Sequence, residues 1–330
     1  MKRVALCNTP TPIWHHRGLS ALVGCELWVK RDDMSSGAAA GNKIRKLEYL
    51  LADALAQGAN AVITCGGEQS NHARATALAA RELGLTPVLV LRTQDPATPP
   101  AATGNLLLNR LCGAELRFIT PAQYRERERY MSELADELRR RGLRPYIIPE
   151  GGSNGVGSFG YISALEELAE QQASGELPRE LDLIAVACGS GGTAAGIALG
   201  LSRFPIAARV AAFAVCDDRA YFEATVSRIV GEARALDPSL AEPAPLDIYD
   251  EFKGPAYSVP SAEQLAFIGA VAQASGLVLD PAYTGKALFG LSRLANKPRR
   301  VLFVHTGGLP GLLAAAPLMA GAWAPGAAAT

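Results

Sequence analysis

Short apolar runs alternate along the chain with longer stretches in which apolar residues recur at helical spacing. The apolar runs predict strands at 25–30, 61–65, 87–91, 115–119, 145–148, 183–188, 210–215 and 301–305. The periodic stretches predict helices at about 42–55, 71–83, 105–111, 122–141 and 155–172, with another after 193. Because strands separated by helices usually pair in parallel, we expect an α/β fold with two open, mostly parallel sheets wrapped by helices.

The composition indicates which kinds of molecule the protein binds. The 330 residues are 49% hydrophobic, which is ample for a large core, and the formal net charge of zero gives no attraction to nucleic acid or to an anionic membrane. The six cysteines are scattered without close pairs, so we expect reduced core cysteines and neither disulfides nor a metal site. With no signal peptide or membrane span expected, the sequence predicts a cytoplasmic protein that binds a small molecule.

A loop rich in glycine, alanine and serine, 35–41, leads to a lysine at the start of the first long helix. We expect Asn42 to be the N-cap, which places Lys43 in the first turn, where the positive end of the helix dipole disfavours a cation. A solvated lysine that tolerates this cost fits the position. A Schiff-base lysine, whose amine must lose its proton before it attacks an aldehyde, fits it as well.

A second glycine-rich loop joins the apolar strand at 183–188 to a helix. Backbone amides of the glycines could face one anion at the helix start, and two hydroxyls could add donors. The loop lacks the ending of a nucleotide P-loop and the spaced glycines of a dinucleotide site, so a monophosphate suits it better. A tight turn with close helix packing remains the alternative. The residues are Gly189, Ser190, Gly191, Gly192 and Thr193.

Two further polar segments follow predicted strands, where ligand contacts gather in α/β folds. Ser70 either caps the next helix or contacts an anion, Asn71 can donate to a phenolic oxygen, and His72 can cover a ring or contact a carboxylate. Tyr283 lies at the start of a late helix, and Thr306 follows the strand at 301–305. Each feature is weak by itself.

Together these motifs resemble one family. The chain has Gly41-Asn42-Lys43 with Arg45-Lys46-Leu47-Glu48, then Gln69-Ser70-Asn71-His72-Ala73-Arg74, Gly189-Ser190-Gly191-Gly192-Thr193, Tyr283-Thr284-Gly285-Lys286-Ala287 and His305-Thr306-Gly307-Gly308. It is similar to the D-cysteine desulfhydrase and 1-aminocyclopropane-1-carboxylate deaminase group, pyridoxal-phosphate enzymes of the tryptophan-synthase-β fold (fold type II).

The resemblance implies roles for the residues that match. Lys43 would bind pyridoxal 5'-phosphate as a Schiff base, Asn71 would contact its phenolic oxygen, the loop 189–193 would hold its phosphate, and Thr306 would face its ring nitrogen. Ser70, Asn71 and His72 would bind the substrate. Ser70, Tyr283 and Tyr257 would join Lys43 as catalytic residues.

Three positions separate the branches of the group. The deaminase branch usually has Gln, Glu and Leu where this chain has His72, Thr284 and Thr306, so the resemblance favours a D-cysteine desulfhydrase. A neutral hydroxyl at Thr306 need not keep the ring nitrogen protonated, and elimination of a good leaving group needs less electron withdrawal than opening a cyclopropane.

Two residues depart from the family pattern. Glu68 replaces an apolar residue, and we expect its carboxylate to point away from the site or to pair with a cation such as Arg74. Ser258 replaces a glycine beside Tyr257, so the loop there is expected to differ in shape.

The predicted reaction is α,β-elimination on a small amino acid, D-cysteine giving pyruvate, hydrogen sulfide and ammonia. The alternatives are a cyclopropane deaminase, a cysteate sulfo-lyase or β-replacement synthase, and a pyridoxal-phosphate carrier without activity. We expect residues 1–45 and 156–330 to form a large cofactor-binding domain, residues 46–155 to form a small domain, and the chain to be a homodimer.

Overall fold

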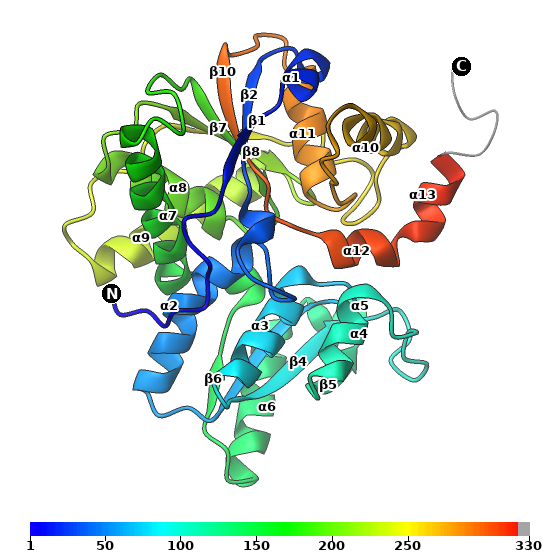
Figure 1. Cartoon of the computed structure of the whole chain (residues 1–330). Coiled ribbons are helices and arrows are strands. Elements are labelled where there is room, and N and C mark those ends of the chain that lie inside the picture. The colour runs from blue at the N-terminus through cyan, green and yellow to red at the C-terminus, as the bar shows by residue number, and fades with distance from the viewer. Residues whose placement is uncertain (323–330) are drawn as a thin grey trace.

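The computed structural model describes residues 1–322 and contains two sheets, one above the other in Figure 1. The six-stranded sheet has the order β1 (Ile13–His15), β2 (Glu26–Lys30), β10 (Arg300–Val304), β7 (Leu183–Cys188), β8 (Arg209–Ala214), β9 (Leu246–Tyr249). The four-stranded sheet has the order β5 (Glu115–Ile119), β4 (Thr86–Arg92), β3 (Ala61–Gly67), β6 (Pro145–Ile147). Every pairing is parallel except that of β1 with β2, so the predicted fold class is confirmed.

Helices cover both faces of the six-stranded sheet. α7 (Gly155–Ala173), α8 (Gly192–Arg203) and α9 (Arg219–Leu236) pack on one face, and α1 (Arg17–Val23), α10 (Ala262–Ser275) and α11 (Thr284–Arg293) pack on the other. Strand β7 shows why its sequence is apolar throughout, because Ile184 and Val186 belong to one core while Leu183 and Ala185 belong to the core on the opposite face.

The four-stranded sheet is covered in the same way. α2 (Asn42–Ala56) and α3 (Asn71–Glu82) pack near Val62, α4 (Gly104–Leu111) packs with α3 over β4, and α6 (Arg127–Arg140) covers the other face. Helix α2 also packs against α7, so it connects the layers of both sheets (Figure 1).

The structure corrects several predicted elements. The single helix expected at 122–141 is two helices, α5 (Pro121–Tyr124) and α6, because Thr120 and Gln123 form a capping box around a short first turn and Glu126 leaves the helical conformation. The break lets the ring of Tyr124 turn inward, where its hydroxyl donates to Glu150 at 2.6 Å. The elements that were not predicted are strands β1 and β9 and helices α1, α9, α10, α12 (Leu309–Ala314) and α13 (Ala316–Ala322).

Within residues 1–322, no helix combines the length and the apolar character needed to cross a membrane. The same part of the chain contains no group of three or more histidine, cysteine, aspartate or glutamate side chains arranged to hold a metal ion.

Candidate active site

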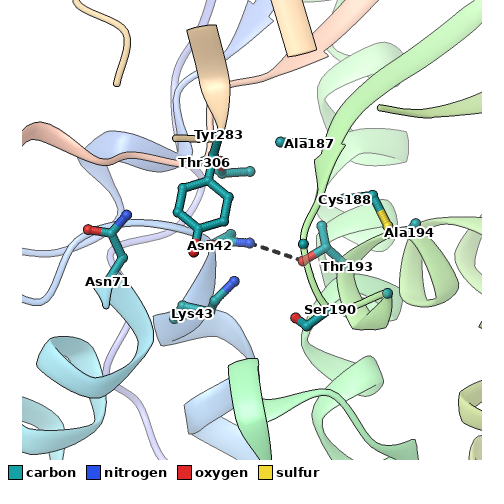
Figure 2. Close-up of a pocket in the computed structure, with 12 residues that line it drawn as sticks. Asn42, Lys43, Asn71, Ala187, Cys188, Ser190, Thr193, Ala194, Tyr283 and Thr306 are labelled. Atoms are coloured by element: carbon teal, nitrogen blue, oxygen red, sulfur yellow. Dashed lines mark hydrogen bonds between the residues drawn. The ribbon is translucent and has the colours of Figure 1, made fainter. Parts of the chain in front are cut away.

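A pocket lies where the carboxyl ends of β7 and β10 meet the starts of α2, α3, α8 and α11 (Figure 2). It brings together most of the residues singled out from the sequence, although they lie far apart along the chain. None of its lining residues is an aspartate or a glutamate. They are Asn42, Lys43, Asn71, Ala187, Cys188, Gly189, Ser190, Gly191, Thr193, Ala194, Tyr283 and Thr306.

Lys43 lies in the first turn of α2, but the predicted cap before it is wrong. Gly41 is the N-cap, with φ 125°, and a Cβ there would lie 2.8 Å from the carbonyl oxygen of Thr306. Asn42 is the first helical residue, and its side chain donates to the Thr193 hydroxyl at 3.0 Å (Figure 2). The backbone of Gly41 thus brings α2 directly against the strand end at Thr306.

The environment of Lys43 favours an uncharged amine. Burial lowers the pKa of Lys43 from 10.5 to about 8, and the more distant Cys188, Glu150 and Asp280 only partly oppose that shift. Lys43 points into the space opposite Ser190 (Figure 2). An amine with this pKa is partly deprotonated near neutral pH, as a nucleophile that attacks a carbonyl must be.

The glycines of the 189–193 loop are required by close contacts. A Cβ at Gly189 would lie 2.9 Å from the Tyr283 ring, and one at Gly192 would lie 2.7 Å from the Ser153 hydroxyl. Gly191 has φ 78°, and α8 begins at Gly192, so the first amides of the helix lie at this loop. The loop therefore forms an anion cup with the hydroxyls of Ser190 and Thr193 on its rim.

A buried lysine to which the sequence assigned no role lies behind this cup. Lys46 is almost completely buried, and its ammonium donates to the Ser153 hydroxyl at 3.0 Å and to the Gly151 carbonyl at 3.1 Å. Ser153 in turn shares a hydrogen bond of 2.8 Å with Ser190. Burial and the neighbouring charge of Lys43 lower the pKa of Lys46 well below its ordinary value, so an anion in the cup would favour its charged form.

Neighbouring residues fix the side-chain oxygen of Asn71 and leave its NH2 group available as a donor. Its side-chain oxygen accepts a hydrogen bond from the Asn105 amide at 3.0 Å, and the same amide donates to the Gln69 carbonyl at 2.9 Å. Because the oxygen is engaged, the NH2 group of Asn71 turns toward the pocket (Figure 2). It can donate to an oxygen of a bound ligand.

Ser70 and His72 are absent from the pocket lining, although Asn71 lies between them. Ser70 is the N-cap of α3, and its hydroxyl accepts from the Ala73 amide at 3.1 Å. The ring of His72 is buried, and its Nε2 donates to the Thr64 hydroxyl at 2.8 Å, since Thr64 itself donates to the Ile148 carbonyl. Burial and the charges of Lys43 and Lys46 lower the pKa of His72 far below its ordinary value, so the ring is neutral.

The two tyrosines form a pair. The hydroxyls of Tyr257 and Tyr283 lie 2.5 Å apart, and Tyr283 lines the pocket while Tyr257 is not among its lining residues. Burial raises the pKa of both phenols, so both remain protonated and can donate.

Thr306 and Thr284 have different surroundings. Thr306 follows β10 and lines the pocket opposite the cup. Thr284 is fully buried, and its hydroxyl donates to Asp280 at 2.7 Å, away from the pocket. Asp280 also accepts from the backbone amides of Tyr283 and Thr284, both at 2.9 Å, so it fixes the start of α11 and the direction of Tyr283.

Of the two placements predicted for the Glu68 carboxylate, the ion pair with Arg74 does not form. Arg74 donates to the carbonyls of Ala38 and Ala40, at 2.9 and 2.8 Å, and so holds the loop that leads to Lys43. Glu68 is partly exposed, and no ion pair of its carboxylate is found in residues 1–322.

Comparisons with known proteins agree with this geometry. The family model described as pyridoxal-phosphate dependent enzyme matches residues 4–307. The chain belongs to this family. Among its relatives, the bifunctional D-cysteine desulfhydrase/1-aminocyclopropane-1-carboxylate deaminase of Arabidopsis thaliana is 42% identical over 93% of this chain and 78% of its own length.

Two further relatives cover nearly the whole chain. The D-cysteine desulfhydrase of Klebsiella pneumoniae is 39% identical over 94% of this chain and 95% of its own length. The crystal structure of a homologue of 1-aminocyclopropane-1-carboxylate deaminase superimposes with a TM-score of 0.89 at 37% identity, covering 98% of this chain and 96% of the other. The fold is therefore the fold type II of pyridoxal-phosphate enzymes, as predicted.

The pocket of this pyridoxal-phosphate-dependent enzyme fits its cofactor. The cup of 189–193 offers donors for a monophosphate, because the first amides of α8 and the hydroxyls of Ser190 and Thr193 lie at the pocket. Lys43 supplies an amine of lowered pKa to the same pocket. Asn71 supplies a free amide donor at the side of the pocket.

Some residues of the site carried little signal in the sequence. Lys46 follows Lys43 by one helical turn, a spacing that could have placed both side chains on one face of α2. Ser153 and Asn105 come from loops and helices whose approach to the cup and to Asn71 depends on tertiary structure, and nothing in their local sequence predicts it.

Proposed function

We propose that the chain catalyses α,β-elimination on a small amino acid and that D-cysteine is its preferred substrate, giving pyruvate, hydrogen sulfide and ammonia with consumption of one water. The observation that carries the proposal is the pocket lining. Thr306 provides a neutral hydroxyl opposite the cup, and no carboxylate lines the pocket in the described residues. A neutral partner suits elimination of a thiol better than ring opening, which needs stronger electron withdrawal.

Pyridoxal phosphate, when bound, withdraws electrons from the α-carbon of the substrate and so makes its proton acidic. The cup of 189–193, backed by Lys46, would hold the phosphate, and Asn71 would donate to the phenolic oxygen of the ring. The amine of Lys43 would take the α-proton, for which its pKa of about 8 is suitable.

The β-thiol that leaves the substrate would lie near the pair of Tyr257 and Tyr283. The bond between the β-carbon and sulfur breaks, and its electron pair leaves with the sulfur. Tyr283 can donate a proton toward the sulfur while Tyr257 replaces the hydrogen bond that Tyr283 gives up, because their hydroxyls already lie 2.5 Å apart. The substrate carboxylate would bind near the start of α3 beside Asn71, where Ser70 and His72 shape the helix terminus.

A substrate panel tests this proposal. Both cysteine enantiomers, cysteate, β-chloroalanine and 1-aminocyclopropane-1-carboxylate are each given to the purified holoenzyme, and the products are identified. Pyruvate with sulfide from D-cysteine is expected. 2-Oxobutyrate, sulfite or a β-substituted amino acid as the main product would replace the proposal by the corresponding alternative, and no product from any substrate would indicate a carrier.

We also propose the domain division, homodimer and cytoplasmic location expected from the sequence. In support of the division, all strands of the four-stranded sheet fall between Ala61 and Ile147, inside the proposed small domain of 46–155. Light scattering of the purified protein tests the homodimer, for which a monomer mass would be the contrary result.

A further inference from the structure

Lys286 is a buried lysine that the proposed mechanism does not use. It lies in the first turn of α11, and its side chain is fully buried. Its ammonium contacts three backbone carbonyl oxygens, those of Lys253 at 2.6 Å, Ala256 at 2.7 Å and Val215 at 3.2 Å. In the described part of the chain it forms no ion pair, so a charge is buried here with carbonyl dipoles alone.

The geometry requires the charged form of this lysine. An ammonium has three N–H donors, which match three carbonyl acceptors, whereas a neutral amine would point its lone pair at one of the oxygens. Burial lowers the pKa of Lys286 to about 8, and the acidic groups of Cys216 and Asp280 partly oppose that shift. Several carbonyl oxygens around one positive charge is the arrangement in which proteins bind monovalent cations.

The three carbonyls belong to the parts of the chain that position the tyrosine pair. We call residues 253–259 the Tyr257 loop. Lys286 holds this loop through the carbonyls of Lys253 and Ala256, directly before Tyr257, and the Ala256 carbonyl also accepts from the Val259 amide at 3.1 Å. Tyr283, three residues before Lys286, holds the same loop through the hydroxyl of Tyr257. The start of α11 therefore contacts the loop at two backbone carbonyls and at the side chain of Tyr257.

The third carbonyl, that of Val215, connects Lys286 to the anion cup. The Val215 amide donates to the Cys188 carbonyl at 3.1 Å, and the Val215 side chain lies 3.2 Å from the position of a Cβ on Gly189. A cation at Lys286 thus joins the end of β8, the Tyr257 loop and α11 at one point.

We propose that Lys286 is a positioning residue, a built-in cation whose contacts with the carbonyls of Val215, Lys253 and Ala256 hold Tyr257 against Tyr283. The inference rests on the proposed function, in which that pair serves the leaving group. It predicts that removal of the ammonium frees the Tyr257 loop and slows turnover, while the cup and Lys43 still hold the cofactor.

Trypsin reports the contact directly, because it cleaves after Lys253, at the carbonyl that Lys286 holds. Native digestion of the holoenzyme is followed by mass spectrometry, and cleavage after Lys253 is normalised to cleavage after the exposed Arg179. Lys286→Met should raise the normalised rate by roughly tenfold or more, since local opening exposes the bond. Lys297→Met is the matched control, because the exposed Lys297 donates to the carbonyl of Val23 on another part of the fold.

Turnover and cofactor content form a second readout. Lys286→Met should lower kcat by roughly 100-fold, the loss expected when a reacting group is misplaced by about 1 Å, with the visible absorbance of the bound cofactor retained. In Lys286→Ala, ammonium or methylammonium should restore kcat and the protection of Lys253, whereas the larger tetramethylammonium, which has no N–H donor, should restore neither.

Equal cleavage after Lys253 in the Lys286→Met and Lys297→Met variants would overturn the proposal. If the Lys286 variants do not fold, Gly254→Ala takes their place, because a Cβ at this residue, with φ +72°, would lie 3.0 Å from Gln264 and 3.1 Å from the Val259 carbonyl. It should raise cleavage and lower kcat, and wild-type values for both would also overturn the proposal. Unchanged kcat in Tyr257→Phe would instead reject the proposed catalytic role of the tyrosine pair, while the digestion result still decides the role of Lys286.

Discussion

The side-chain amide of Asn42 donates a hydrogen bond of 3.0 Å to the hydroxyl of Thr193, which joins the helix of Lys43 to the loop 189–193. The two residues are 151 positions apart in the chain. Since Lys43 follows Asn42 directly, this bond sets the distance between the amine and the cup. The site is therefore fixed by a contact between α2 and α8 and not by either helix alone.

Asn42→Ala should destabilise the protein and loosen the site. Loss of one partner of a buried hydrogen bond costs about 1–3 kcal/mol, and urea unfolding of the apoenzyme measures it. Gln57→Ala is the control at the exposed end of the same helix, where a change within about 0.5 kcal/mol is expected. Equal stability of both variants would show that the bond between Asn42 and Thr193 contributes nothing.

A buried ionic cluster holds the same helix on its other side. Arg45 donates to Asp32 at 2.8 and 3.0 Å and to Glu167 at 2.8 and 3.0 Å, and Lys30 donates to Glu167 at 2.5 Å. Burial would raise the pKa of Asp32 and Glu167, but the charge and hydrogen bonds of Arg45 outweigh it, so the pKa of both carboxyls is lowered.

The cluster predicts a loss of stability in acid. A carboxyl whose pKa is lower in the folded state stabilises the fold above its unfolded pKa, about 4, and this contribution is lost as the pH falls through the folded pKa. The free energy of unfolding should therefore drop below about pH 4, and Asp32→Asn should weaken the pH dependence. Asp136→Asn, at an exposed carboxylate, should not. The same pH slope in all three proteins would contradict the assignment.

Arg45→Met should lower the free energy of unfolding by about 3–5 kcal/mol at neutral pH, since it leaves buried carboxylates without their partner.

Ser258 departs from the family pattern and adopts a left-handed backbone, with φ 58°. Such a conformation costs a residue other than glycine about 1–2 kcal/mol. Glycine avoids this cost, but its greater conformational entropy in the unfolded state offsets part of the stabilisation. Ser258→Gly should therefore raise the free energy of unfolding by up to about 1 kcal/mol. Ser174→Gly, at φ −76°, should lower it by roughly 0.5–1 kcal/mol. Destabilisation by Ser258→Gly would show that the serine side chain makes a stabilising contact.

Thr306→Val tests the hydroxyl opposite the cup. The shapes of the two side chains are similar, so the cofactor should stay bound, while loss of one neutral hydrogen bond worth about 0.5–1.5 kcal/mol should lower kcat by roughly two- to tenfold. Thr98→Val, in an exposed loop, is the control. Kinetics that match the control would show that another residue faces the ring nitrogen.

The sequence predicted what local pattern determines. Lys43, Asn71 and the cup lie at junctions of strands and helices, and β7 is apolar because both of its faces are buried. Orientations were harder to predict, because they depend on contacts across the fold. His72 turns toward Thr64 and Thr284 toward Asp280. Glu126 leaves the helical conformation and so divides α5 from α6, and Lys46 reaches the cup only because Ser153 approaches it from another loop.

Borohydride reduction of the holoenzyme, followed by peptide mapping, tests the central claim most directly. Two lysines of α2, Lys43 and the buried Lys46, lie near the same cup, but only Lys43 lines the pocket, while the amine of Lys46 donates to Ser153. The account predicts that the reduced cofactor is found on Lys43 in the wild-type protein and on no lysine in Lys43→Ala. Cofactor attached to Lys46 or to any other lysine, or no attachment in the wild-type protein, would contradict it.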